Sequence, residues 1–340
     1  MLNKAESAVM TMITDPDIQN SIHNAVEGFL DSISLARSKN TARTYRNGME
    51  IFQRALGEHK IDPGKTPVNE IKEDTVVWLA NALKDHAPTT ERLYLTVATG
   101  FFEFLAAENL APINLPRIRL LIRQRGRRPG IRLPQFPHDD IEKVLLYAEA
   151  LSSSPASDDA ERLRSLRDRA FIITLADTGL RVHEACNLRR GDIDWNEGRA
   201  VIIGKGDKQA VVRFSKRSQS AIKDYLTARA SLDGSSGRPL SALPLFARHD
   251  LGAGKKVKPI QTNTGRNIVE QRVEEALGTD ASRITPHSFR HYFVTRVLQA
   301  SGNLKLAQEL ARHRNIAVTQ RYAHLSDNEL DQGYFEIFEE

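Results

Sequence analysis

The stretch LARHRNIAVTQRY, from Leu310 to Tyr322, contains three arginines, one histidine and one tyrosine, and it contains no acidic residue. His313 and Tyr322 are nine residues apart, so one straight helix would place them on opposite faces. Asn315 can cap a new helix after His313. We therefore expect one helix to end near His313 and a second helix to carry Tyr322, so that both side chains can face one pocket. Taken alone, Tyr322 is either a packing residue or a nucleophile.

A second basic cluster lies in the stretch TPHSFRHYF, which begins at Thr285. Thr285 is a good N-cap residue and Pro286 suits the first position of a helix. His287 then lies at a helix N-terminus, where the backbone N–H groups favour an anion. Arg290 is three residues further on, on the same face, and His291 is four residues after His287. The alternative is a capped helix with basic residues on its surface.

The histidines His287, His291 and His313 could also be considered as metal ligands, because an i, i+4 pair has suitable spacing. No glutamate lies between the first two, however, and Arg290 on the shared face would repel a cation. We therefore expect no metal ion and no cofactor.

Two further stretches carry candidate residues. In DTGLRVHEACNL, Gly179 can close a helix in the left-handed conformation. Arg181 follows, and Glu184 is placed to hold its guanidinium group; the alternative is an ordinary surface pair. Lys205 is flanked by glycines at the tip of a predicted hairpin, where it is either simply exposed or able to enter a pocket and donate a proton.

Together these residues form a set suited to phosphate chemistry. Two arginines can clamp a phosphate and stabilise the charge of a five-coordinate phosphorus. A lysine or a histidine can supply the proton that the leaving oxygen needs. A tyrosine can form a covalent ester that is later reversed.

The sequence predicts a mainly α-helical fold with a small antiparallel β-sheet. The evidence is the helical periodicity of the apolar residues, the alternating pattern of a hairpin, and the positions of the proline and glycine residues that end these elements. Residues 19–115 read as a domain of four helices, and residues 137–325 as a larger helical domain that carries the sheet. We expect residues 1–18 to be an N-terminal extension, residues 116–136 to be a basic linker without a continuous helix, and residues 326–340 to be a tail.

The linker contains a run of arginines without an acidic residue, which is either a solvated charge run or a strap along a phosphate backbone. We favour the strap, which would position the protein rather than read sequence. The arginines concerned are Arg117, Arg119, Arg123, Arg125, Arg127, Arg128 and Arg132.

The composition of the chain limits the classes of protein to which it can belong. The 340-residue chain has a net charge of +5, which suits a polyanionic partner, and its single cysteine excludes an intrachain disulfide. The sequence has neither a secretory signal nor an apolar run of membrane length, so we expect a cytoplasmic protein without a membrane partner.

The order of these residues resembles that of the tyrosine recombinases, or phage integrases, over about residues 19–326. The family pattern is Arg, Lys, His-x-x-Arg, His or Trp, and Tyr. In this sequence it corresponds to residues within four strings, TGLRVHE, GKGDK, PHSFRH and TQRYAH. The remaining histidine lies nine residues before the tyrosine. The matching residues are Arg181, Lys205, His287, Arg290, His313 and Tyr322.

The resemblance implies the DNA breaking-rejoining fold, with an N-terminal core-binding domain and a catalytic domain that clamp double-stranded DNA. Tyr322 would be the nucleophile that forms a 3′-phosphotyrosyl bond, and Lys205 would be the general acid. Arg181, Arg290 and His313 would stabilise the transition state. In supporting roles, His287 would assist proton transfer with His291 beside it, and Glu184 would position Arg181. No ATP or metal would be required.

The resemblance also implies a homo-oligomer, a tetramer on synapsed DNA, with the tail at 326–340 docked on a neighbouring protomer. The alternative is a tail docked on its own domain. The sequence departs from the family at Arg312, where glycine is usual. The alternative functions are a type IB topoisomerase-like relaxing enzyme and a non-catalytic sequence-specific DNA-binding regulator.

Overall fold

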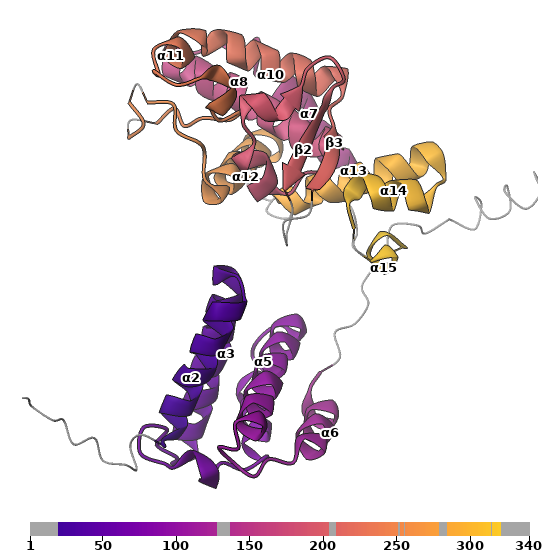
Figure 1. The fold of residues 1–340 in the computed structure, drawn as a ribbon. Helices are drawn as coiled ribbons and strands as arrows, with labels where there is room; N and C mark the ends of the chain where they lie inside the picture. The colour runs from indigo at the N-terminus through magenta and orange to yellow at the C-terminus, as the bar shows by residue number, and fades with distance from the viewer. Residues whose placement is uncertain are drawn as a thin grey trace, which may run out of the picture. The chain divides into compact units, whose positions relative to one another are not determined.

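The computed structural model describes residues 20–127, 137–203, 209–250, 252–254, 256–278, 284–313 and 315–320. The chain divides into two compact units, Met1–Arg132 and Leu133–Glu340, and each has its own hydrophobic core (Figure 1). The division falls inside the segment 116–136 that the sequence marks as a linker.

The first unit is helical. Its helices are α2 (Ile22–Ala36), α3 (Lys39–Glu58), α4 (Thr75–Ala82), α5 (Pro88–Ala107) and α6 (Leu115–Arg125), with a 3-10 turn η1 (Val68–Glu70). Helix α3 packs between α2 and α5. The buried rings of Phe29, Phe52, Phe101 and Phe102 lie 5.7–6.0 Å apart between these helices, in tilted and edge-on arrangements that suit aromatic rings.

Helix α6 corrects one expectation. The sequence predicts a linker without a continuous helix over 116–136, but the first half of that segment belongs to a helix, Leu115–Arg125, which ends before Gly126. Asn114 caps it by accepting a hydrogen bond from the backbone N–H of Arg117 at 3.0 Å, and a proline in the first helical turn costs no hydrogen bond. Ile118 is fully buried against the unit, so packing stabilises a sequence that is otherwise rich in charge.

The end of α6 is fixed by a buried carboxylate. Glu91 on α5 is 0% exposed and forms an ion pair with Arg127 and another with Lys84 at 3.1 Å. It also accepts the backbone N–H of Arg127 at 2.8 Å. Because a buried charge must be paired, Arg127 and Lys84 tie the chain after α6 to α5.

The second unit surrounds helix α8. Its helices are α7 (His138–Ala150), α8 (Asp159–Thr178), α9 (Val182–Asn187), α10 (Lys216–Ala228), α11 (Ala230–Gly234), α12 (Thr262–Leu277), α13 (Pro286–Ser301), α14 (Leu304–Ala311) and α15 (Ile316–Gln320), with 3-10 turns η2 (Arg190–Asp192) and η3 (Leu240–Ala242). Helix α8 packs against α7, α10, α12 and α13, and most of its residues from Ser165 onward are buried, including the ion pair of Arg167 and Asp168.

The sheet has three antiparallel strands in the order β1 (Ile193–Asp194), β2 (Arg199–Ile203) and β3 (Gln209–Arg213). The hairpin β2–β3 is the predicted one, and β1 is an addition. Ala200 pairs with Val212, and both are buried; Val201 pairs with Val211, and both are exposed. This alternation places one face of the sheet on the core.

Within the described ranges, none of the helices combines the length and apolar character needed to cross a membrane.

Candidate active site

The site begins at the turn between α8 and α9. Gly179 ends α8 in the left-handed conformation with φ 59°, as predicted, and its N–H donates to Leu175 O at 3.2 Å. A Cβ atom at this position would lie 2.5 Å from the ring of Phe293 on α13. Glycine is therefore required both by the backbone conformation and by the close approach of α13.

Arg181 follows this turn and is held by Glu184, as predicted. Glu184 Oε2 accepts the backbone N–H of Arg181 at 2.9 Å, and Oε1 accepts from its guanidinium Nη1 at 2.9 Å. The side chain of Glu184 is 4% exposed, whereas that of Arg181 is 45% exposed. A buried carboxylate thus fixes the base of a guanidinium group that remains open to a ligand.

Helix α13 supplies His287 and Arg290. Thr285 is its N-cap residue and Pro286 its first residue, as the sequence predicts. Arg290 is 2% exposed and donates to Gly179 O at 2.5 Å, and also to Ala311 O at the end of α14. Arg290 therefore joins the α8–α9 turn to the end of α14.

His313 lies between α14 and α15, and the predicted helix break is confirmed. Helix α14 ends at Ala311, and α15 begins at Ile316, directly after Asn315. His313 Nδ1 lies 2.9 Å from the hydroxyl of the buried Thr319 on α15. This contact fixes the orientation of the imidazole ring.

The three histidines are surrounded by cations. Burial, followed by the charges of Arg290 and Arg181, lowers the pKa of His313 to about 4. The same causes lower the pKa of His287. Burial and the neighbouring His287 lower the pKa of His291 to about 4, and the two rings meet edge-on with centroids 4.3 Å apart. All three are therefore neutral at pH 7.

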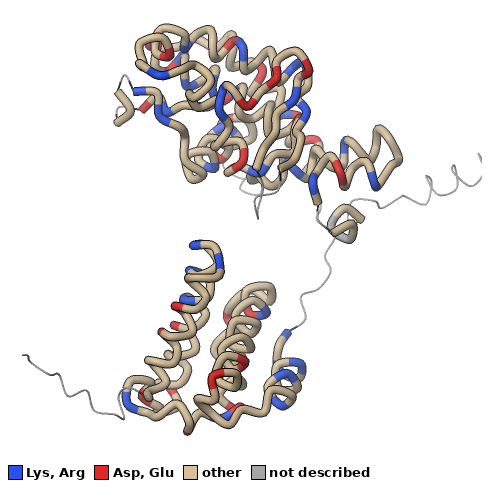
Figure 2. Tube along the Cα trace, in the orientation of Figure 1, with Lys and Arg blue, Asp and Glu red and all other residues tan. Residues whose placement is uncertain are grey.

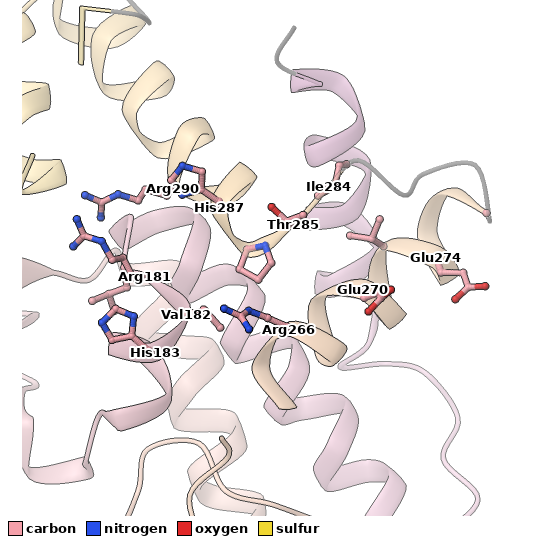
Figure 3. Close-up of a pocket in the computed structure, with 14 residues that line it drawn as sticks. Arg181, Val182, His183, Arg266, Glu270, Glu274, Ile284, Thr285, His287 and Arg290 are labelled. Carbon is pink, nitrogen blue, oxygen red and sulfur yellow. The ribbon is translucent and has the colours of Figure 1, made fainter. Parts of the chain in front are cut away.

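Three of the predicted residues line one cavity of about 660 Å³. Arg181, His287 and Arg290 lie together at one end, and Figure 3 shows the guanidinium groups of Arg181 and Arg290 on the same side. Arg266 and Glu270 on α12 line another part of the wall. The end of the cavity that carries Arg181, His287 and Arg290 is basic and suits an anionic group.

Other predicted residues lie outside the described residues. These are Lys205, Tyr322, Arg128 and Arg132.

The arginines of the basic segment have different surroundings. Arg117 pairs with Asp74 at 2.9 Å and Arg119 with Glu103 at 2.8 Å. Arg127 is held by Glu91. The side chains of Arg123 and Arg125 are exposed at the end of α6, which Figure 2 shows as a concentration of basic residues.

Arg312 is a residue of the site whose contacts the sequence did not reveal. Its guanidinium Nη2 donates to Glu184 Oε2 at 3.1 Å and to Gly179 O at 3.3 Å. The signal was present as an arginine at a position where the family usually has glycine, but the partner is 128 residues away in the chain.

Comparison with known proteins defines the class. The model of the phage integrase family matches residues 137–329, more than half of the chain. The tyrosine recombinase XerC of Alcanivorax borkumensis is 31% identical over 94% of this chain and 95% of its own length. The tyrosine recombinase XerD of Brucella melitensis biotype 1 is 28% identical over 90% of this chain and 94% of its own length.

Solved structures agree on the fold. The XerH site-specific recombinase bound to palindromic difH substrate matches with a TM-score of 0.65 and 20% identity, over 95% of this chain and 91% of that one. The Tn1549 transposon integrase in complex with transposon right end DNA matches with a TM-score of 0.64 and 17% identity, over 94% of this chain and all of that one.

The fold and the family match together define a site-specific tyrosine recombinase, an enzyme that cleaves and rejoins DNA. More particularly, the chain belongs to the phage integrase family, and its curated relatives include XerC and XerD recombinases. The comparisons give no support to a DNA-relaxing enzyme or to a non-catalytic regulator.

Proposed function

We propose that this recombinase cleaves DNA by attack of the Tyr322 phenolic oxygen on a phosphodiester that is bound at Arg181 and Arg290. The observation that carries the proposal is the convergence of Arg181, His287 and Arg290 on one cavity. The segment that carries His313 is held near them, because Arg290 donates a hydrogen bond to Ala311 O, two residues before His313. These groups come from three parts of the chain, the α8–α9 turn, helix α13 and the segment after α14, so their convergence is a property of the fold.

The attack would form a bond between the Tyr322 oxygen and phosphorus while the bond from phosphorus to the 5′-oxygen breaks. The products are a 3′-phosphotyrosyl ester and a 5′-hydroxyl. The phenol loses a proton and the leaving oxygen gains one, which we assign to Lys205 as general acid. Reversal by a 5′-hydroxyl rejoins the strand, so no ATP is consumed.

Arg181 and Arg290 would stabilise the charge that develops on the non-bridging oxygens. His313 would donate to the same phosphate: if the Thr319 hydroxyl donates to Nδ1, the proton resides on Nε2. His287 would assist proton transfer, with His291 packed against it. The low pKa of His313 supports a neutral hydrogen-bond donor rather than a permanent cation.

Double-stranded DNA is the partner that we infer, because solved neighbours such as XerH and the Tn1549 integrase are bound to DNA. We place the enzyme in the cytoplasm and propose a homo-oligomer, a tetramer on synapsed DNA, with the tail at 326–340 docked on a neighbour. The domain bounds proposed from the sequence, 19–115 and 137–325, assign DNA contacts to both units.

A nicked suicide substrate, from which the 5′-fragment is lost after cleavage, tests this proposal. The wild-type chain is expected to form a covalent adduct that survives SDS, and Tyr322→Phe is expected to bind the same DNA without forming the adduct. EDTA should leave the adduct yield unchanged, because the cationic side chains would supply the electrostatic stabilisation. Normal cleavage by the phenylalanine variant would refute the assignment of the nucleophile.

A further inference from the structure

Arg312 has an unusual backbone. Its φ is 57°, the left-handed conformation that glycine adopts without steric cost, and it serves as the C-cap residue of α14. Among the described residues, Lys60 and Asn109 are the other non-glycine residues with positive φ. Lys60 is exposed, whereas the side chain of Arg312 is only 11% exposed. The Arg312 side chain is therefore largely buried in the second unit, unlike that of Lys60.

The contacts of this side chain lead to the Arg181 turn. Arg312 Nη2 donates to Gly179 O at 3.3 Å, the same carbonyl oxygen that accepts from Arg290 at 2.5 Å. It also donates to Glu184 Oε2 at 3.1 Å, the oxygen that accepts the backbone N–H of Arg181. Two arginines on separate elements thus converge on one turn, and Arg312 directly precedes His313 in the chain.

Glu184 is the centre of this network. Its carboxylate is 4% exposed, and burial alone would favour the neutral form. Against that effect, hydrogen bonds from Arg181 and the charges of Arg312 and Arg181 keep its pKa below the ordinary value. Arg181 is 45% exposed and Arg312 only 11%, so Arg312 is the more buried counterion. An opposite charge acts more strongly where solvent screens it less.

We propose that Arg312 is a positioning residue, which holds the Glu184 carboxylate and the 179–184 turn in place so that Arg181 points at the scissile phosphate. The inference rests on the proposed function of Arg181. Arg312 acts through Glu184 and Gly179 and makes no contact with DNA in this assignment. Its Nε and Nη1 atoms are buried and make no hydrogen bond in the protein, so a direct contact with phosphate is the competing assignment that the experiment must separate.

The test uses the full chain and single-turnover cleavage of the suicide substrate at saturating DNA. Arg312→Gly removes the side chain and retains a residue that accepts the backbone conformation. Lys60→Gly is the matched control, because it replaces an exposed basic residue with φ 63° in the other unit. We expect Arg312→Gly to lower the cleavage rate constant by roughly tenfold to a hundredfold, as a misplaced catalytic group does, and to leave the Kd for uncleaved DNA unchanged.

Two further measurements separate positioning from a loss of stability. In an Arg181→Lys background, Arg312→Gly should have little additional effect, because the group that it positions is already altered. Millimolar guanidinium chloride should restore part of the cleavage rate of Arg312→Gly, whereas the same concentration of sodium chloride should not. If Arg312→Gly does not fold, Arg312→Lys, which keeps a cation, is tested for the same non-additivity.

An unchanged rate constant in Arg312→Gly, or losses that simply add in the double variant, would overturn the inference. A loss of DNA affinity in Arg312→Gly would also overturn it and would assign Arg312 to direct phosphate binding. The absence of a covalent adduct with the wild-type chain is a different result, because it refutes the proposed function itself.

Discussion

His291 and His313 illustrate how single residues are tuned in this site. Each is partly buried and lies near cations, and for each the pKa is lowered from 6.5 to about 4. A neutral imidazole can act as a hydrogen-bond donor in the site without adding to the charge of two arginines. Because these pKa values are lowered in the folded state, the stability of the fold is expected to fall as the pH is lowered.

The unfolded chain takes up these two protons near pH 6.5, whereas the folded chain takes them up only near pH 4. Between these values the unfolded state binds more protons, so its population rises as the pH falls. We expect the second unit to lose stability across this window, with each histidine contributing on the order of 1 kcal/mol after allowance for solvent screening.

Urea unfolding of the wild-type chain and of His291→Gln at pH 7, 5.5 and 4.5 measures this contribution. The variant should show a shallower decline in stability between pH 6.5 and 4. His183→Gln, on the exposed surface of the same unit, serves as the control. Identical pH dependence in the wild-type chain and His291→Gln would show that His291 does not titrate as described.

Local rules predicted several structural features around the candidate site correctly. Gly179 in the left-handed conformation, the Arg181–Glu184 pair and Thr285 at a helix N-terminus all depend on neighbours within four positions. The role proposed for Arg312 could not be predicted in this way. The energetic cost of its left-handed conformation is offset by hydrogen bonds to Gly179 and Glu184, which lie in a distant part of the chain. Sequence patterns at short range do not contain such contacts.

At the scale of elements, α6 shows that amino-acid composition alone does not predict where a helix forms. Arginine density and nearby glycines predict an interrupted segment, but an asparagine cap and the packing of Ile118, Leu121 and Ile122 on the first core stabilise a helix as far as Arg125. The helix also separates its arginines into two kinds. Arg117 and Arg119 form ion pairs with the protein, whereas Arg123 and Arg125 extend into solvent at the end of the helix.

We therefore expect Arg123 and Arg125 to be the phosphate contacts of α6. Replacing both with glutamine should reduce the slope of log K against log salt by about 2, because each neutralised phosphate contributes roughly 0.9. The matched control replaces Arg117 and Arg119 with glutamine and should change the slope less. Binding is measured by fluorescence anisotropy between about 50 and 200 mM salt. Equal slopes for both double variants and the wild-type chain would remove α6 from the DNA interface.

On the scale of the whole molecule, the two units have separate cores, and the buried pair of Glu91 with Arg127 belongs entirely to the first. Removing this buried carboxylate breaks its hydrogen bonds with Lys84 and with the side chain and backbone N–H of Arg127. Glu91→Ala should therefore destabilise the first unit by about 2 kcal/mol and leave the unfolding of the second unit unchanged.

Two reporters follow the two units in one denaturant titration, because each unit contains one tryptophan, Trp78 in the first and Trp195 in the second. Trp78→Phe and Trp195→Phe isolate one signal at a time. Glu91→Ala should shift the midpoint reported by Trp78 only. A shift of both midpoints by the same amount would mean that the chain unfolds as one cooperative block.

The division into two units was predictable at this scale, because proline, glycine and charge mark the segment between two stretches of helical periodicity. The order of the candidate residues also predicted the family, and the family match over residues 137–329 confirms that prediction. The additional strand β1 was not predicted, because two residues are too few for an alternating pattern.

The separate cores also bear on protein engineering. A protein whose halves each bury their own apolar surface can exchange one half for that of a relative without exposing either interior. Chimeras joined between Arg127 and Pro137 would therefore show whether the first unit of another recombinase folds when it is linked to this second unit.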